Sequence, residues 1–226
     1  MTLSVRSALN CLGHAGNASV VRDLFGLSYV PRPLSLRRQL ELLKGEHLNL
    51  NIILVAPENF APDEPQAWQE IFGGIQIARE IFSQVDLGIG KLEYWHISAA
   101  QAGTYAVTDS EAEARALADD WTVPNDMLDV FIVRRASFAG RSSVDGPCDK
   151  NSKSKMNGCV VSLLGDTANV GNTLAHELAH YLGLNHVLDD NNFIGGDGGS
   201  DAWTGIYAWQ GDIMKKHCFV RPGCPG

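Results

Sequence analysis

The order of apolar and polar residues predicts a chain that alternates between strands and helices. Residues 48–55 begin with alternating apolar positions and end in an unbroken apolar run, as in a buried strand. Residues 66–84 repeat their apolar side chains close to the period of a helix, and residues 90–98 are rich in aromatic and β-branched side chains. A strand, a long helix and a second strand predict one right-handed crossover unit of a sheet.

Further elements are expected in the second half of the chain. Residues 109–118 predict a short helix, because acidic residues come first and alanines recur throughout. Residues 127–133 and 158–164 predict two more strands, separated by a polar excursion at residues 136–155. The first 45 residues follow no such pattern, and we expect them to form an N-terminal extension, either a pro-segment or accessory helices.

The composition limits the classes of partner. Of the 226 residues, 45% are apolar and 19% are charged, and the formal net charge is −8. This charge gives no reason to expect nucleic acid or an anionic membrane as a partner. No apolar run approaches the about 20 residues that a transmembrane helix needs. Residues 1–21 also lack the continuous apolar core of a secretory signal.

The five cysteines nevertheless favour an oxidising, extracellular destination. Cys148 and Cys159 flank a lysine-rich stretch, while Cys218 and Cys224 close a short tail that contains proline and glycine. Both spacings suit local disulfides, although four cysteines allow three pairings and the sequence does not choose among them. A metal site is the alternative for these four, but the chain contains no C-x-x-C unit. Cys11 is the odd cysteine.

Three of the seven histidines fall within eleven residues, in the order HExxHxxGxxH. His176 and His180 are four residues apart, so on a helix both imidazoles lie on one face. Gly183 suits the left-handed backbone of a helix end and lets the chain turn sharply, which brings in His186. Three imidazoles that leave one position open are typical of a catalytic zinc site, beside which Glu177 would lie.

This run resembles the zinc-binding consensus of the metzincin metallopeptidases. The resemblance implies a zinc-dependent endopeptidase of protein or peptide substrates, with zinc held by His176, His180 and His186. It also implies that Glu177 acts as general base and general acid for the attacking water. Metzincins carry a methionine-containing turn below the metal, and Met214 is the only methionine that follows the motif. No residue in the sequence argues for an oligomer, so we expect a monomer.

The resemblance implies an α+β, zincin-like fold. Its parts would be a twisted, mostly parallel sheet with an antiparallel edge strand, a long backing helix, a zinc helix and a small C-terminal subdomain. Residues 46–226 would form this catalytic domain, divided into an upper subdomain at 46–183 and a lower one at 184–226. Substrates of such enzymes add to a sheet edge as a further strand. We expect that edge in the strand before the zinc helix, formed by Val160, Val161, Ser162, Leu163 and Leu164.

Several alternatives remain open in the sequence. The third metal ligand could instead be His217 or one of the aspartates Asp189, Asp190, Asp197, Asp201 and Asp212. The acidic, glycine-rich residues 189–201 could bind calcium, although their spacing fits no EF-hand pattern and favours a solvated loop. Cys11 could keep the enzyme latent by occupying the metal, as a pro-segment cysteine does in some metzincins, although an unpaired thiol is the simpler reading.

The sequence departs from the metzincin pattern at two positions, and it leaves two other functions open. Val187 follows the third histidine and assigns no metzincin subgroup. Lys216 stands where some members have a tyrosine that assists the reaction, and Tyr207 is the substitute we consider. The chain could be a zinc-containing binding module without activity, although such a module needs no Glu177. It could also be a protease deployed as a toxin or effector.

Overall fold

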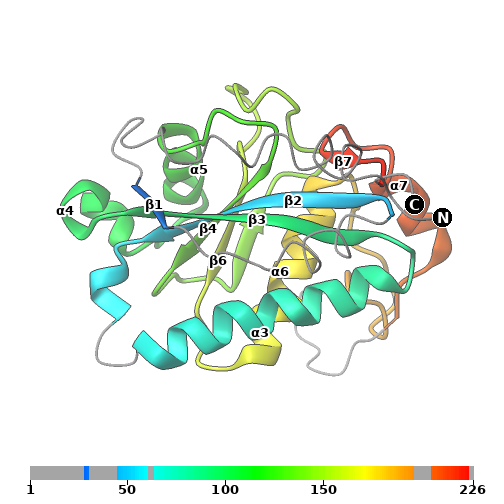
Figure 1. Cartoon of the computed structure of the whole chain (residues 1–226), viewed down its shortest axis with the longest axis horizontal. Coiled ribbons are helices and arrows are strands. Elements are labelled where there is room, and N and C mark those ends of the chain that lie inside the picture. The colour runs from blue at the N-terminus through cyan, green and yellow to red at the C-terminus, as the bar shows by residue number, and fades with distance from the viewer. Residues whose placement is uncertain (1–27, 31–44, 61–63, 196–204, 224–226) are drawn as a thin grey trace, which may run out of the picture.

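The computed structural model describes residues 28–30, 45–60, 64–195 and 205–223, which form a twisted sheet with helices on both faces (Figure 1). The strands lie in the order β1-β3-β2-β4-β6-β5, and β7 pairs with β2. Their bounds are β1 (Ser28–Val30), β2 (His47–Val55), β3 (Gly88–Ile97), β4 (Leu128–Val133), β5 (Gly140–Ser142), β6 (Cys159–Ser162) and β7 (Val220–Arg221). The central strands β3, β2, β4 and β6 are parallel, whereas β1, β5 and β7 pair antiparallel. The predicted fold class is therefore confirmed.

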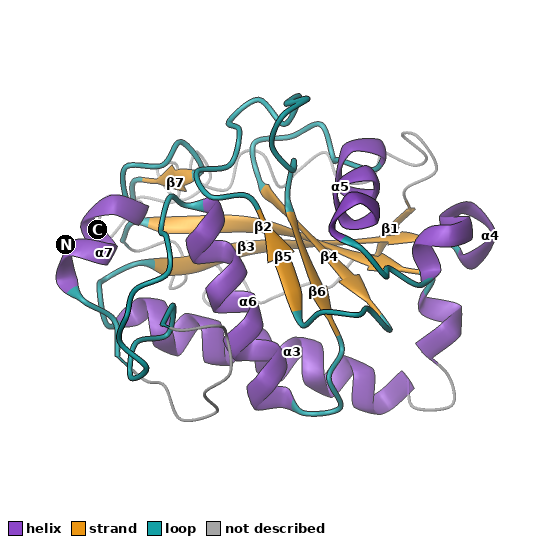
Figure 2. Cartoon of the chain, turned by 180° about the vertical axis from the view of Figure 1, so that it is seen from behind, coloured by secondary structure: helices purple, strands orange, loops and turns teal. Residues whose placement is uncertain are grey.

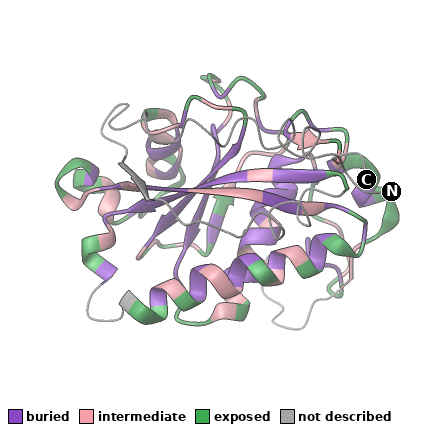
Figure 3. Cartoon of the chain, in the orientation of Figure 1, coloured by how far each residue is buried: buried purple, intermediate pink, exposed green. Residues whose placement is uncertain are grey.

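The two faces of the sheet carry separate apolar cores. Helices α3 (Glu64–Ser83) and α6 (Thr167–Tyr181) cover one face, and α5 (Glu111–Asp120) covers the other (Figure 2). In β2, Ile52 packs in the core beneath α3 and α6, while its neighbour Ile53 packs in the core beneath α5. Figure 3 shows β2, β4 and β6 buried along most of their length, which explains the continuous apolar runs in the sequence.

Four short helices complete the described elements. They are η1 (Pro57–Phe60), α4 (Ala99–Ala102), η2 (Gly103–Ala106) and α7 (Ala208–Met214). Among the helices of the described residues, none is both long and apolar enough to cross a bilayer.

Glycines allow α3 and α6 to pack closely. A Cβ on Gly74 would lie 3.2 Å from the backbone nitrogen of Gly171, and a Cβ on Gly171 would lie 2.6 Å from the Cβ of Ile77. A glycine within a helix costs about 1 kcal/mol relative to alanine. The close packing of α3 against α6 that these glycines allow offsets this cost, so the long helix α3 forms despite its glycines.

The predicted strands and helices of residues 48–164 are confirmed, with ends that shift by a few residues. The structure adds β1, which lies within the N-terminal extension and pairs with β3 at the far edge of the sheet. It also adds β5, which lies within the polar excursion at residues 136–155. Cys11 lies outside the described residues.

The prediction that the strand before the zinc helix forms the sheet edge is wrong. That strand is β6, and it pairs with β4 on one side and with β5 on the other. The edge on this side of the sheet is β5, where Gly140 pairs with Val161 and Ser142 with Cys159. Strand β5 has three residues, Gly-Arg-Ser, and no apolar alternation, so its sequence does not indicate a strand.

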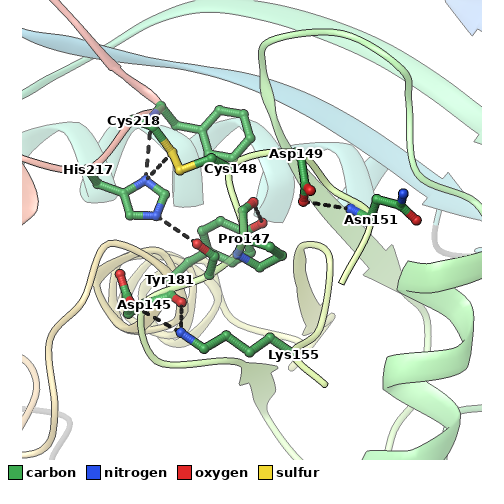
Figure 4. Close-up of a disulfide and its surroundings, with 11 residues drawn as sticks. Asp145, Pro147, Cys148, Asp149, Asn151, Lys155, Tyr181, His217 and Cys218 are labelled. Carbon is green, nitrogen blue, oxygen red and sulfur yellow. Dashed lines mark hydrogen bonds and ion pairs between the residues drawn. A yellow bond between two sulfur atoms is a disulfide. The ribbon is translucent and has the colours of Figure 1, made fainter. Parts of the chain in front are cut away.

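The disulfide joins two parts of the chain that lie far apart in the sequence. Cys148 bonds to Cys218, a separation of 70 residues (Figure 4). Cys159 is a free thiol buried in β6, so its selection as a disulfide candidate is wrong, and burial raises its pKa. Cys224 lies outside the described residues. The short spacings between neighbouring cysteines therefore did not predict the pairing, because the fold brings Cys148 and Cys218 together across 70 residues of sequence.

Candidate metal centre

Helix α6 presents the first two histidines from a buried position. Asp166 caps its first turn by accepting a hydrogen bond from the backbone nitrogen of Ala168 at 2.9 Å. The helix then packs against the sheet and alongside α3, with residues such as Leu174 and Leu178 in the apolar core. This packing fixes the rotation of the helix about its axis and hence the direction of both imidazoles.

The Nε2 atoms of the three motif histidines converge on one point. The distance is 3.0 Å between His176 and His180, 3.0 Å between His176 and His186, and 3.1 Å between His180 and His186. Among the described residues, no aspartate shares this cluster. Asp197 and Asp201 lie outside the described residues. The third nitrogen at this point therefore comes from His186.

Backbone carbonyls set the protonation of two of these imidazoles. The Nδ1 of His176 lies 3.1 Å from the oxygen of Phe193, and the Nδ1 of His180 lies 2.7 Å from the oxygen of Leu184. A carbonyl oxygen only accepts, so each Nδ1 carries the hydrogen and each Nε2 of the neutral ring presents a lone pair. Burial and the neighbouring His180 lower the pKa of His176 to about 4, and burial lowers the pKa of His180.

Gly183 makes the turn that brings in the third histidine. Its φ is +105°, a conformation that side chains disfavour. Its backbone nitrogen donates to the oxygen of His180 at 2.9 Å, and that of Leu184 donates to the oxygen of Ala179 at 3.0 Å. These bonds end the helix and redirect the chain toward His186.

The loop that carries the disulfide caps the same helix end. The backbone nitrogen of Asp145 donates to the oxygen of His180 at 3.0 Å, and that of Gly146 donates to the oxygen of Tyr181 at 2.8 Å. The hydroxyl of Tyr181 donates to the oxygen of Pro147 at 2.9 Å. Figure 4 shows this loop beside Tyr181 and His217, whose rings are 5.6 Å apart between their centroids. The disulfide thus holds a segment that satisfies the last carbonyls of the metal helix.

Glu177 directly follows His176 on α6 and lies in a nearly closed environment. Only 6% of the residue is exposed, and burial raises its pKa to about 8, while the charge of Arg141 opposes that rise. Strand β5 approaches it closely, because a Cβ on Gly140 would lie 2.7 Å from its Oε1. Glycine at this position leaves room for the carboxylate next to the edge strand.

The geometry fits a tetrahedral zinc ion. Two nitrogens at the usual Zn–N distance of about 2.0–2.1 Å are about 3.3 Å apart at a tetrahedral angle. The observed separations of 3.0–3.1 Å are close to this value. Three lone pairs that face one another also repel unless a cation lies between them. The donor set of three neutral imidazoles is one that zinc prefers.

The remaining sequence candidates occupy other places. His217 lies at the disulfide, where its Nε2 faces the oxygen of Gly146 at 3.0 Å. Tyr207 is partly exposed, and its hydroxyl donates to the carboxylate of Asp189. Met214 ends α7 and is fully buried in the core that also contains Leu178. Its packing beneath the imidazoles, and calcium binding by the acidic loop, stay predictions.

Sequence reasoning missed the parts that orient the ligands. The carbonyl of Phe193 and the loop that carries the disulfide have no motif of their own. The one available signal was the glycine-rich, Asn-containing sequence after the motif, which is typical of turns.

Comparisons with known proteins give a fold but no close relative. No protein-family profile matches the sequence, and no curated protein matches it. Metalloproteinase-II from Bacteroides fragilis matches 78% of this chain with 12% identity and a TM-score of 0.51, and the chain spans 54% of its length. Mirolysin in complex with compound 9 matches 75% of this chain with 11% identity and a TM-score of 0.51, over 91% of its own length.

A third structure, archaemetzincin from Methanopyrus kandleri, has 17% identity and a TM-score of 0.48, and the match covers 76% of this chain and 95% of that one. The TM-score of this third match is too low to add to the argument. At these identities the two better matches bear on the fold alone. The chain has the fold of zincin-like metalloproteinases.

Proposed function

We propose that this protein is a zinc-dependent endopeptidase. The observation that carries the proposal is the convergence of three histidine Nε2 atoms within 3.1 Å beside a buried glutamate. The fold shared with solved metalloproteinases supports it, and so does the retention of Glu177, which a purely structural zinc site does not need.

His176, His180 and His186 would hold the zinc. When bound, zinc lowers the pKa of water toward about 7 and polarises the carbonyl under attack. Helix α6 holds two of these ligands rigidly, and the backbone carbonyls of Phe193 and Leu184 keep their Nδ1 atoms protonated. Ligand nitrogens that are oriented in this way need little rearrangement when the metal binds.

Glu177 would move the proton. A carboxylate whose pKa of about 8 is close to the pKa of about 7 for zinc-bound water can accept a proton from that water and pass it to the leaving amine. Its burial behind β5 excludes other water from the carboxylate. No nucleophilic serine or cysteine is needed for this reaction.

Strand β5 would bind the main chain of the substrate. It is the sheet edge next to Glu177, and among the described residues its outer side pairs with no other strand. A peptide that adds to this edge would place its carbonyls near Glu177, because Gly140 contacts that side chain. The Cys148–Cys218 disulfide is consistent with an oxidising, extracellular location.

The test compares the wild-type protein with Glu177→Ala on casein, with a chelator control. The variant should keep its zinc but lose hydrolysis about 10²- to 10⁴-fold, because the proton shuttle is gone while the ligands remain. Sequencing of the fragments distinguishes internal cleavage from trimming of the ends. A zinc-loaded wild type with no activity on casein or on peptide libraries would instead support a binding module.

A further inference from the structure

A buried pair of amides connects α7 to the loop that follows the metal-binding turn. The Nδ2 of Asn192 donates to the Oε1 of Gln210 at 2.9 Å, and the Nε2 of Gln210 donates back to the Oδ1 of Asn192 at 2.9 Å. Asn192 is 3% exposed and Gln210 is fully buried. Two amides that satisfy each other out of contact with water define one geometry, because any other leaves buried polar atoms without partners.

Each amide also holds the backbone on its own side. The Oδ1 of Asn192 accepts from the backbone nitrogen of Ile194 at 3.2 Å, and the Oε1 of Gln210 accepts from the backbone nitrogen of Tyr207 at 2.7 Å. Phe193 lies between Asn192 and Ile194 in the loop, and its own backbone nitrogen donates to the oxygen of Gly205 at 3.0 Å. The peptide groups on both sides of Phe193 are therefore fixed.

The end of α3 supports both partners of the pair. The ring of Phe193 packs edge-on against Phe82, with centroids 6.3 Å apart. Helix α7 approaches the residues just after α3 so closely that a Cβ on Gly211 would lie 2.6 Å from the Cβ of Val85. The loop that contains Phe193 and helix α7 thus both pack against the C-terminal end of α3, and the amide pair sets their relative position.

Phe193, which these bonds hold in place, contacts His176, one of the proposed metal ligands. The oxygen of Phe193 faces the Nδ1 of His176 at 3.1 Å, so the placement of this carbonyl decides which nitrogen of His176 carries the hydrogen and where the ring points. His180 takes its carbonyl partner from the adjoining turn, at Leu184. His176 instead depends on a residue seventeen positions away, which only the tertiary structure brings close.

We propose that Asn192 and Gln210 are positioning residues for the metal centre, which act on His176 through the carbonyl of Phe193. The inference rests on the proposed zinc site and adds the device that orients one ligand. Partners of this kind are worth about 10- to 100-fold in metal affinity in zinc proteins. Loss of the pair should therefore weaken zinc binding even though neither residue contacts the metal.

The test measures the zinc dissociation constant by competition with a chelator in Asn192→Ala and in a matched control, Asn157→Ala. Asn157 is an equally buried amide, 3% exposed, whose Nδ2 donates to the carboxylate of Asp119 on α5 at 2.6 Å. Both variants lose buried hydrogen bonds, so both should lose stability. Asn192→Ala should raise the zinc dissociation constant about 10- to 100-fold, and Asn157→Ala should leave it unchanged.

Two further measurements separate positioning from general damage. Nitrogen-15 spectra of the metal-free wild type should show His176 with its hydrogen on Nδ1, and Asn192→Ala should show a mixture of both forms. Because the two amides act as one unit, the double variant with Gln210→Ala should cost no more zinc affinity than either single change. If Asn192→Ala does not fold, Gln210→Glu, which keeps the size of the side chain, takes its place.

Unchanged zinc affinity in the folded Asn192 or Gln210 variant would overturn the inference, and so would an equal loss in Asn157→Ala. If the wild type itself bound no zinc, the proposed function would fail. The imidazole spectra of the metal-free proteins would then decide the inference alone, with an unchanged His176 as the contrary result.

Discussion

The three clustered histidines come from two regions that are held in place in different ways. His176 and His180 lie on α6, where most residues of the last two turns are buried against the sheet and the neighbouring α3. His186 lies in the segment after Gly183, where the described elements are short, namely α7 and β7. That segment is held by the Asn192–Gln210 amide pair, isolated bridges and the Cys148–Cys218 disulfide.

The difference predicts unequal local stability. Continuous apolar burial stabilises the sheet and α6, whereas the later segment adds separate buried side chains such as Met214 to the same core and relies more on specific bonds. Regions with few buried apolar contacts open at lower free energy than the core. A zinc ion that joins His186 to the two helix histidines would couple the regions, because it binds only when both are in place.

The largest effect should come from removing a ligand on the rigid helix. His180→Ala should reduce the zinc content after dialysis from about one per chain to near zero, because two imidazoles do not make a tight site. The control is His217→Ala, which removes a buried histidine that faces the oxygen of Gly146 and lies outside the cluster. Elemental analysis gives the result, and full retention of zinc in His180→Ala would refute the assignment of the site.

A smaller loss should follow removal of the disulfide. Replacing Cys148 and Cys218 by serine together opens a constraint between residues 70 positions apart. Bonds of this kind commonly contribute about 2–4 kcal/mol to the free energy of unfolding. Hydrogen exchange in the native state should show loss of protection first in residues 205–223. An equal loss of protection throughout α3 would contradict the predicted difference in local stability, since the core helices and the later segment would then unfold together.

The smallest effect should come from the turn between the regions. Gly183→Ala should cost about 1–3 kcal/mol, because its φ of +105° disfavours a side chain, whereas the nearest atom, on Ile213, leaves ordinary contact distance. Gly165→Ala is the matched control, since Gly165 also has a positive φ and open space around its Cβ position. Chemical denaturation should show a loss in both, while zinc affinity should fall only in Gly183→Ala.

The sequence determined the central strands and the main helices, because burial on a sheet or against a helix imposes a local period on apolar residues. It also predicted that His176, His180 and His186 lie together, because one helix and one turn set their relative positions within eleven residues. Interactions of this range are encoded by spacing alone. The mostly parallel sheet with an antiparallel edge strand was predicted from the family resemblance, and not from any residue pattern.

The tertiary structure decided the rest. It placed the three-residue strand β5 at the edge beside Glu177, paired Cys148 with Cys218 and left Cys159 free. It also brought the carbonyl of Phe193 to His176. These contacts join residues that are distant in sequence and have no periodic pattern, so their partners are defined only after the sheet and helices have packed. The histidine cluster can therefore be predicted from the sequence, whereas the groups that support it are revealed only by the fold.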